Sequence, residues 1–132
     1  MFYCLWPDPA ALPESSNDAS MVVVWEADGI RVLFTGDIET EAERALQEKN
    51  IRADILKVAH HGSRSSSGEE FLRAVQPQLA VISARKAAYG HPHPETLERL
   101  QKTGIAYKIT EETGAITVHI RRRSLRWETY KK

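Results

Sequence analysis

The chain has 132 residues, 18 basic and 18 acidic side chains, and a hydrophobic fraction of 42%. This length corresponds to one domain of roughly 100–200 residues, and the composition excludes an intrinsically disordered polymer. No apolar run approaches the roughly 20 residues of a transmembrane helix, and the N-terminus lacks the basic start and long apolar core of a secretory signal.

The first part of the sequence predicts antiparallel strands. Residues 2–6 are apolar and predict a short strand, and the proline-rich stretch 7–18 predicts a loop. A β-branched run over 20–27 predicts the next strand. Asp28-Gly29 is a strong signal for a two-residue hairpin turn, after which 30–35 forms the return strand.

The middle of the sequence predicts helices alternating with strands, the pattern of an α/β layered domain. The expected helices and strands are residues 39–50 (helix), 53–59 (strand), 69–76 (helix), 79–83 (strand) and 95–103 (helix). Strands over 105–110 and 115–121 are then predicted to form a closing hairpin around Glu112-Thr113-Gly114. We find no internal repeat and no low-complexity linker.

The C-terminal stretch 121–132 is strongly basic, with six Lys or Arg and one acid, whereas the rest of the chain has an acidic excess. We expect it to be a solvated extension of the last strand. Because it also carries Trp127 and Tyr130, contact with nucleic acid phosphates or with an anionic lipid surface is an alternative.

The polar residues of greatest interest occur in three short segments, each placed directly after a predicted strand. These segments are TGD (35–37), HHGS (60–63) and GHPHP (90–94). A layered α/β fold gathers its functional loops at such strand ends. They hold four of the five histidines. The fifth, His119, lies inside a predicted strand, where we expect an ordinary half-exposed residue.

Asp37 and the two adjacent histidines form a donor set suited to Zn²⁺ or Mn²⁺. Cys4 is the only cysteine, so a metal site in this chain must rest on histidines and carboxylates. Gly36 permits a sharp turn that points Asp37 into a cleft, although Asp37 could instead cap the following helix. His60 and His61 point to opposite faces unless the strand breaks there.

The third segment places His91 and His93 between prolines, which restrict the backbone. Restriction suits a catalytic side chain, because less entropy is lost when it is held in place. The alternative is that His93 only begins the next helix, with Pro94 in its first turn.

These motifs resemble a known family. NDAS (17–20), VLFTGDIE (32–39), LKVAHHGSRSSS (56–67) and YGHPHPE (89–95) occur in this order in the metallo-β-lactamase-like domain of the ComEC family of bacterial competence proteins. The resemblance covers about residues 2–120, the C-terminal part of that domain. HHGS and GHPHP together are specific, whereas TGD alone would be weak.

The resemblance implies the C-terminal half of an αββα sandwich, a mixed sheet with flanking helices, that binds two divalent metals and hydrolyses phosphodiesters. It implies a partial domain over 1–120 and a basic tail over 121–132. The implied metal ligands are Asp37 and His61, and the implied catalytic residues are His60 and His93, with His93 a proton donor to the leaving oxygen. Ser63 and His91 would contact substrate.

The upstream His-x-His-x-Asp-His ligand motif of this family is missing from the 132 residues. We therefore expect an expressed piece, a gene fragment or a degenerate homologue that is inactive alone. Two alternatives remain open: a non-catalytic structural or binding module, and a metallo-hydrolase of small-molecule esters.

The expected partners are DNA, the missing N-terminal half and a second copy of the chain, since half a sandwich exposes a sheet face. We expect a soluble chain. Its parent protein would lie in the bacterial inner membrane, with this domain on the outer face as one option.

Overall fold

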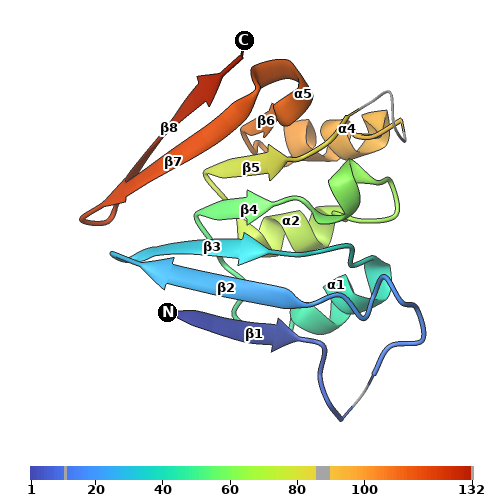
Figure 1. Cartoon of the computed structure of the whole chain (residues 1–132). Coiled ribbons are helices and arrows are strands. Elements are labelled where there is room, and N and C mark those ends of the chain that lie inside the picture. Colours follow the sequence, from blue (N-terminus) through green and yellow to red (C-terminus); the bar gives the residue numbers. More distant parts are fainter. Residues whose placement is uncertain (11, 86–89, 132) are drawn as a thin grey trace.

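The computed structural model of the chain describes residues 1–10, 12–85 and 90–131. Its centre is a six-stranded mixed sheet whose strands follow one another in chain order (Figure 1). The first three strands pair antiparallel and the last three join them in parallel. These strands are β1 (Phe2–Trp6), β2 (Val22–Ala27), β3 (Ile30–Phe34), β4 (Ile55–Lys57), β5 (Leu79–Ile82) and β6 (Tyr107–Ile109).

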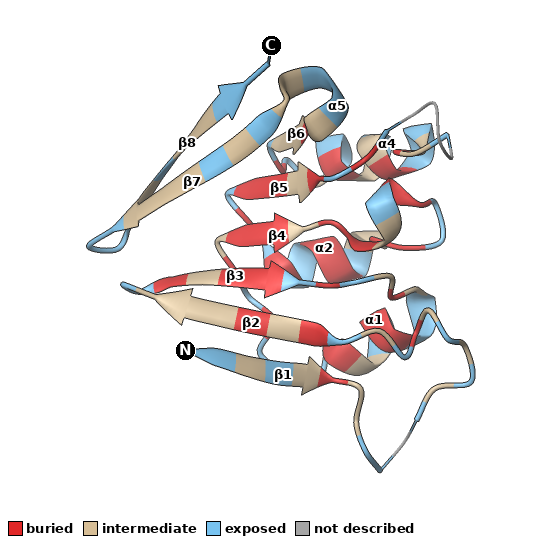
Figure 2. Ribbon diagram, in the orientation of Figure 1, coloured by how far each residue is buried: buried red, intermediate tan, exposed pale blue. Residues whose placement is uncertain are grey.

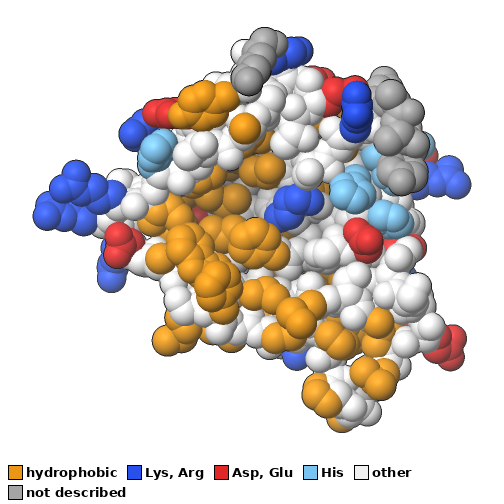
Figure 3. Space-filling view, in the orientation of Figure 1, with side chains coloured by type: hydrophobic (Ala, Val, Ile, Leu, Met, Phe, Trp, Pro, Cys, Tyr) orange, Lys and Arg blue, Asp and Glu red, His pale blue; other side chains and the backbone are white. Residues whose placement is uncertain are grey.

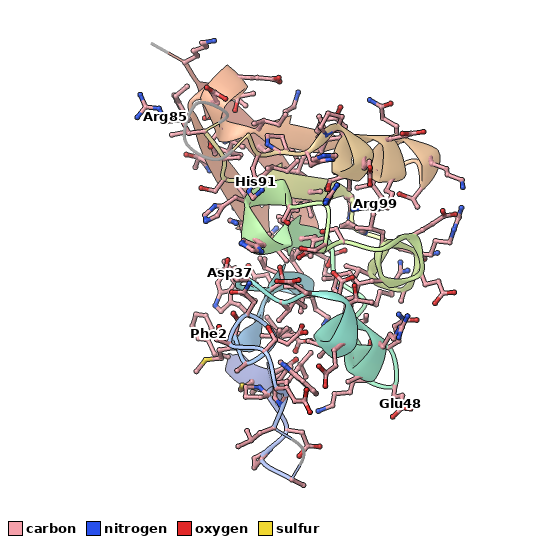
Figure 4. All side chains as sticks on the ribbon, turned by 90° about the vertical axis from the view of Figure 1, so that its right-hand side faces the viewer. Phe2, Asp37, Glu48, Arg85, His91 and Arg99 are labelled. Carbon is pink, nitrogen blue, oxygen red and sulfur yellow. The ribbon has the colours of Figure 1, made fainter. Side chains whose placement is uncertain are left out.

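Three helices lie on one face of this sheet, α1 (Thr40–Leu46), α2 (Glu69–Val75) and α4 (Pro94–Lys102), as the two perpendicular views show (Figures 1 and 4). The short 3-10 turn η1 (Ala59–Gly62) follows the carboxyl end of β4, and α5 (Thr110–Thr113) follows β6 and leads into the C-terminal strands. The predicted α/β class with a mixed sheet and flanking helices is therefore confirmed. None of the described helices is long and apolar enough to cross a membrane.

The hydrophobic core lies between the helices and the sheet (Figure 2). Leu33 and Leu56 point from the sheet into this layer, where they meet Phe71 and Leu72 of α2 and Leu46 of α1, all at most 1% exposed. Each of these strand residues alternates with a neighbour on the other face, as the period of a β-strand requires. The core is thus complete on the helix side.

The other face of the sheet can be read from the strand register, because directly paired residues point to the same side. One row across it is Phe2, Trp25, Val32, Ile55 and Leu79. A second row, nearer the carboxyl ends of the parallel strands, is Cys4, Val23, Phe34, Lys57 and Val81. We call these two rows the open face.

The prediction for the C-terminal strands was wrong. Strand 107–109 does not form a hairpin with the next strand but pairs with β5, because residues 110–113 form α5 instead of a tight turn. Residues 121–132 are not an extension of that next strand either. Their segment β8 (Ser124–Tyr130) folds back on β7 (Ala115–Arg121) as a separate two-stranded sheet.

This β7–β8 hairpin is amphipathic. Val118 pairs with Trp127 and Ile120 with Leu125 on its half-buried face. Since the helices cover the other side of the sheet, the burial of Val32, Ile55 and Leu79 indicates that the hairpin covers the part of the first row that lies on β3, β4 and β5. Phe2, at the other end of this row, is 69% exposed, and Phe34 in the second row is 43% exposed.

Candidate functional site

The three polar segments meet at the carboxyl ends of β3, β4 and β5. The His60 N–H donates to the Gly36 carbonyl at 2.9 Å, which joins the TGD and HHGS segments. The His93 N–H donates to the Gly62 carbonyl, also at 2.9 Å, which joins HHGS to the proline-flanked histidines. Figure 4 looks onto this edge of the sheet and shows Asp37 and His91 on neighbouring loops.

The strand breaks before the two adjacent histidines. Strand β4 ends at Lys57, and His60 and His61 adopt left-handed conformations with φ of 50° and 53°. Non-glycine residues with positive φ are uncommon, and such strain concentrates at functional sites. Because the backbone turns here, the alternation of a strand no longer forces the two imidazoles to opposite faces.

Gly62 completes this turn with a φ of 83° and lies against Pro92. A Cβ at Gly62 would lie 2.6 Å from Pro92 Cβ, closer than side-chain atoms approach. Glycine is therefore required both by the backbone angle and by the close approach of the third segment.

Two histidine rings are held by backbone groups that select opposite tautomers. His61 Nδ1 lies 2.6 Å from the Ser83 carbonyl oxygen, which can only accept, so Nδ1 carries the proton and Nε2 has the lone pair. His93 Nδ1 accepts from the Glu95 N–H at 3.1 Å, so in the neutral ring Nε2 carries the proton. His61 is exposed, which leaves its Nε2 free to act as a ligand.

The His93 contact also confirms that this residue begins a helix. It is the N-cap of α4, and Pro94 occupies the first turn. Capping uses only Nδ1, so the two interpretations of His93 are compatible.

His60 and His91 form an edge-to-face pair with ring centroids 5.8 Å apart. His60 Nδ1 also lies 4.0 Å from the Glu39 carboxylate. Burial lowers the pKa of His91, and positive charge on His60, His61 and His93 lowers it further. His91 is therefore neutral at pH 7. Figure 3 shows histidine side chains gathered at this edge.

Asp37 does not cap α1. The oxygen that accepts from the first turn of this helix is Oδ1 of buried Asp18, at 2.7 Å from the Glu39 nitrogen and 3.2 Å from the Ala42 nitrogen. The Asp37 backbone N–H donates to Ser20 Oγ. The Asp37 carboxylate is half-buried and close enough to Lys57 to oppose the lowering of the Lys57 pKa that burial causes.

Ser63 is buried, and its Oγ lies 3.0 Å from Ser65 Oγ. Its carbonyl accepts from Thr96 Oγ1 at 3.0 Å, which ties the histidine segment to α4. The exposed side of this loop is formed by Arg64 and Ser65.

Two charged side chains that the sequence does not single out hold the loop after the histidines. Buried Glu43 of α1 accepts from the Ser67 N–H at 2.5 Å and from the Gly68 N–H at 3.0 Å. Arg99 of α4 donates to the carbonyls of Arg64, Ser66 and Ser67. Burial raises the pKa of Glu43 to about 7, although both hydrogen bonds and the Arg99 charge oppose this.

Lys57 is a further residue that the sequence analysis missed. It lies in the second row of the open face between Phe34 and Val81. Its signal in the sequence is a single charge within the apolar strand 53–59, whereas Glu43 and Arg99 have the pattern of ordinary helix-surface residues.

The donors at this edge have the chemistry of a Zn²⁺ or Mn²⁺ site, but they are too few to complete one. Within residues 1–10, 12–85 and 90–131, no group of three or more His, Cys, Asp or Glu is arranged to hold a metal ion. A zinc site needs at least three protein ligands. Asp37 and His61 have donor atoms of the kinds that Zn²⁺ accepts, but the described residues alone do not make a zinc site.

The chain is similar to several curated proteins. ComE operon protein 3 of Bacillus subtilis is 42% identical over 125 residues, which cover 92% of this chain and 16% of that protein. Competence protein ComA of Neisseria gonorrhoeae is 38% identical over 104 residues, 76% of this chain and 15% of that protein. Recombination protein 2 of Haemophilus influenzae is 33% identical over 106 residues, 80% of this chain and 14% of that protein.

No protein-family model matches the chain. The chain spans between 14% and 16% of the length of these three relatives. Their names support a competence-related family for this chain, as the resemblance of its motifs implies.

Proposed function

We propose that this chain is the C-terminal half of a metallo-β-lactamase-like domain that hydrolyses phosphodiester bonds of DNA with a divalent metal. In this proposal Asp37 and His61 are metal ligands, and the remaining ligands come from a polypeptide segment outside these 132 residues. The names of the relatives, which refer to competence and recombination, support DNA as the substrate class.

The opposite tautomers of His61 and His93 carry the proposal. A metal-bound histidine needs a free ring nitrogen and is usually oriented through the other one, often by a backbone carbonyl. His61 has this arrangement through Ser83. A general acid needs a proton on the nitrogen that faces the substrate, and the cap at Glu95 leaves that proton on His93 Nε2.

A divalent ion, when bound, supplies Lewis acidity to the phosphoryl group and lowers the pKa of a water. The residues of this chain would act around it. His93 Nε2 would donate a proton to the leaving oxygen, and His60, which faces Glu39, would hold or relay a proton. Neutral His91 and the Ser63 loop would contact a phosphate oxygen.

The open face supports the proposal that a further polypeptide segment packs against this sheet and supplies the remaining ligands. Its second row has half-exposed apolar side chains around Lys57, next to the histidines (Figure 3). An apolar surface beside a partial ligand set is what remains when one half of an interface is removed. The missing half of the domain is therefore the occupant that we propose for this face.

Calorimetric titration of the chain with Zn²⁺ tests the ligand assignment. We expect weak binding, because only two ligands are available, and a loss of about 10-fold or more in affinity for His61→Ala and for Asp37→Asn. Binding should also weaken at acidic pH, because a histidine ligand must be neutral to bind a metal.

His119→Ala is the matched control. His119 is a partly exposed histidine on β7 that faces Glu128, and its loss should leave Zn²⁺ binding unchanged. Equal losses at His61 and His119 would contradict the site. Robust hydrolysis of a model phosphodiester by the chain alone would contradict the claim that its site is incomplete. If the chain, once joined to the missing half of the domain, hydrolysed carboxylic esters only, the small-molecule hydrolase would be favoured. No metal binding in any form would favour the non-catalytic binding module.

A further inference from the structure

Two hairpin turns touch at the end of the molecule opposite the histidines (Figure 1). Asp28 and Gly29 connect β2 to β3 and have φ of 51° and 77°. Arg122 and Arg123 connect β7 to β8 and have φ of 48° and 64°. Both turns have two central residues with positive φ, as a type I′ turn requires.

The two turns differ in how well their residues suit this backbone. Asp-Gly is among the most favourable pairs for a type I′ turn, whereas arginine carries a Cβ that opposes the left-handed conformation at both positions. Strained backbone conformations at residues unsuited to them concentrate at functional sites. The conformation of this turn therefore indicates a functional role for the guanidinium groups of Arg122 and Arg123.

The contact between the turns fixes where these arginines lie. The Arg123 N–H donates to the Asp28 carbonyl at 2.8 Å. The Arg123 side chain passes over Gly29, where an added Cβ would lie 2.6 Å from its Cγ. The tip of the β7–β8 hairpin is therefore held against the main sheet.

The result is a cluster of exposed positive charge, consisting of Arg121, Arg122 and Arg123, which we call the arginine tip. Nearby Arg126 does not add to it, because it pairs with Glu128. Figure 3 shows Lys and Arg side chains protruding at this end of the molecule. Three neighbouring guanidinium groups favour a ligand with repeated negative charges.

We propose that the arginine tip binds the phosphate backbone of a nucleic acid. Residues 121–126 include no large hydrophobic side chain that is strongly exposed, and the exposed Met1 and Phe2 at this end belong to the N-terminus and not to the tip. A bilayer is therefore tested beside DNA, because exposed apolar side chains next to basic ones also suit a membrane surface. The proposal shares with the proposed function only the class of partner. It does not depend on a metal, and it assigns a contact at the opposite end of the sheet from the histidines.

Fluorescence anisotropy of labelled single-stranded oligothymidylate, titrated with the chain in EDTA, tests this proposal. If three phosphates are contacted, the affinity should fall roughly 20-fold between about 50 and 200 mM salt. The double variant Arg122→Asn/Arg123→Gly should bind at least about 10-fold more weakly at the lower salt, and its affinity should then change only about 3-fold over the same range. Asp28→Asn keeps a favourable turn and removes a negative charge, so it should bind more tightly.

The Arg122→Asn/Arg123→Gly variant should also unfold at a higher urea concentration than the wild type, because its turn residues suit the backbone. Arg122→Gln/Arg123→Gln removes the same charge without this gain and should lose the same binding. Arg44→Gln removes an exposed positive charge from the helix layer and should bind as the wild type does.

Three results would overturn the proposal: no binding by the wild type at the lower salt, unchanged binding by both turn variants, or binding to phosphatidylglycerol vesicles without binding to DNA. Because EDTA removes metal, DNA binding without any Zn²⁺ binding would leave this proposal standing while the proposed function fails.

Discussion

The two faces of the central sheet are packed very differently. On the helix side, Leu33, Leu56 and Phe71 are at most 1% exposed and form a continuous core. On the open face, Phe34 and Phe2 are 43% and 69% exposed, and the β7–β8 hairpin covers only the part of the first row that lies on β3, β4 and β5, namely Val32, Ile55 and Leu79. Both faces belong to the same strands and differ only in what packs against them.

This difference separates two roles. The helix side supplies the burial that holds the fold together, and Glu43 and Arg99 extend from it to hold the loop after the histidines. The open face contributes less burial and lies beside Asp37 and His61, the proposed metal ligands. A domain whose second half is a separate stretch of polypeptide would be expected to divide stability and association in this way.

The largest effect should come from truncating the core. Phe71→Ala should lower the free energy of unfolding by about 3–5 kcal/mol, because it leaves a cavity in the helix layer. Phe34→Ala on the open face should lower it by about 1 kcal/mol or less. Urea unfolding of both variants measures the contrast, and equal losses would show that the open face is not an unfilled interface.

Protonation of Glu43 should give the next largest effect. Its pKa is about 7 in the folded chain and about 4.5 when unfolded, so the folded state binds more protons between these values. The contribution of Glu43 to the free energy of unfolding is therefore fully present below pH 4.5 and is lost as the pH rises through 7. The loss is on the order of 3 kcal/mol.

Urea unfolding at pH 5 and pH 8 tests this assignment with Glu43→Gln as the comparison. The variant cannot ionise, so it should lack this part of the pH dependence. His91, whose pKa is lowered by burial, contributes with the opposite sign in both proteins, so its effect cancels in the difference. The same pH slope in both proteins would rule out a titrating Glu43.

A comparison of two glycine substitutions distinguishes the cost of backbone strain from the cost of close packing at the site. Gly62→Ala and Gly104→Ala both place a Cβ on a residue with positive φ, at 83° and 72°. Of the two, only the Cβ at Gly62 meets other atoms within 4 Å, most closely Pro92 at 2.6 Å and then Ile82 at 3.4 Å. We expect Gly104→Ala to cost about 1 kcal/mol and Gly62→Ala to cost at least about 1 kcal/mol more. Equal costs would mean that the two loops are not in close contact.

The smallest effect should be on association through the open face. The chain should self-associate at high concentration, so that light scattering gives an average mass above 14.9 kDa. Phe34→Glu should restore the monomer mass, whereas Arg44→Glu on the helix layer should not. A wild-type chain that stays monomeric at high concentration would contradict this prediction.

Much of the sheet and its loops could be predicted from local sequence. Asp28-Gly29 between two β-branched runs predicts the β2–β3 hairpin, and the alternating strands and helices predict the parallel part of the sheet. The positions of TGD, HHGS and GHPHP after strands then follow, because parallel strands end at one edge.

The C-terminal strands could not be predicted in the same way. Glu112-Thr113-Gly114 has the composition of a hairpin turn but belongs to α5 and its C-terminal end. The real hairpin turns at Arg122-Arg123, a pair with no turn signal, although Leu125 and Trp127 do alternate as a strand requires.

Site details were also invisible in the sequence where they depend on distant residues. Asp18 caps a helix more than 20 residues away, and Glu43 contacts Ser67 and Gly68 across a similar separation. The left-handed turn at His60 and His61 depends on the backbone of Gly36 and on Pro92 beside Gly62. Such contacts are set by tertiary packing and not by local pattern.

The most direct test of the partial metal site is NMR spectroscopy of the histidine ring nitrogens during titration with Zn²⁺. Before Zn²⁺ is added, His61 should be protonated on Nδ1 and His93 on Nε2, as their backbone partners require. On addition of Zn²⁺, the His61 Nε2 resonance should shift first, while His119 is unaffected. A His61 ring protonated on Nε2, or a Zn²⁺ response at His119 equal to that at His61, would contradict the proposed site.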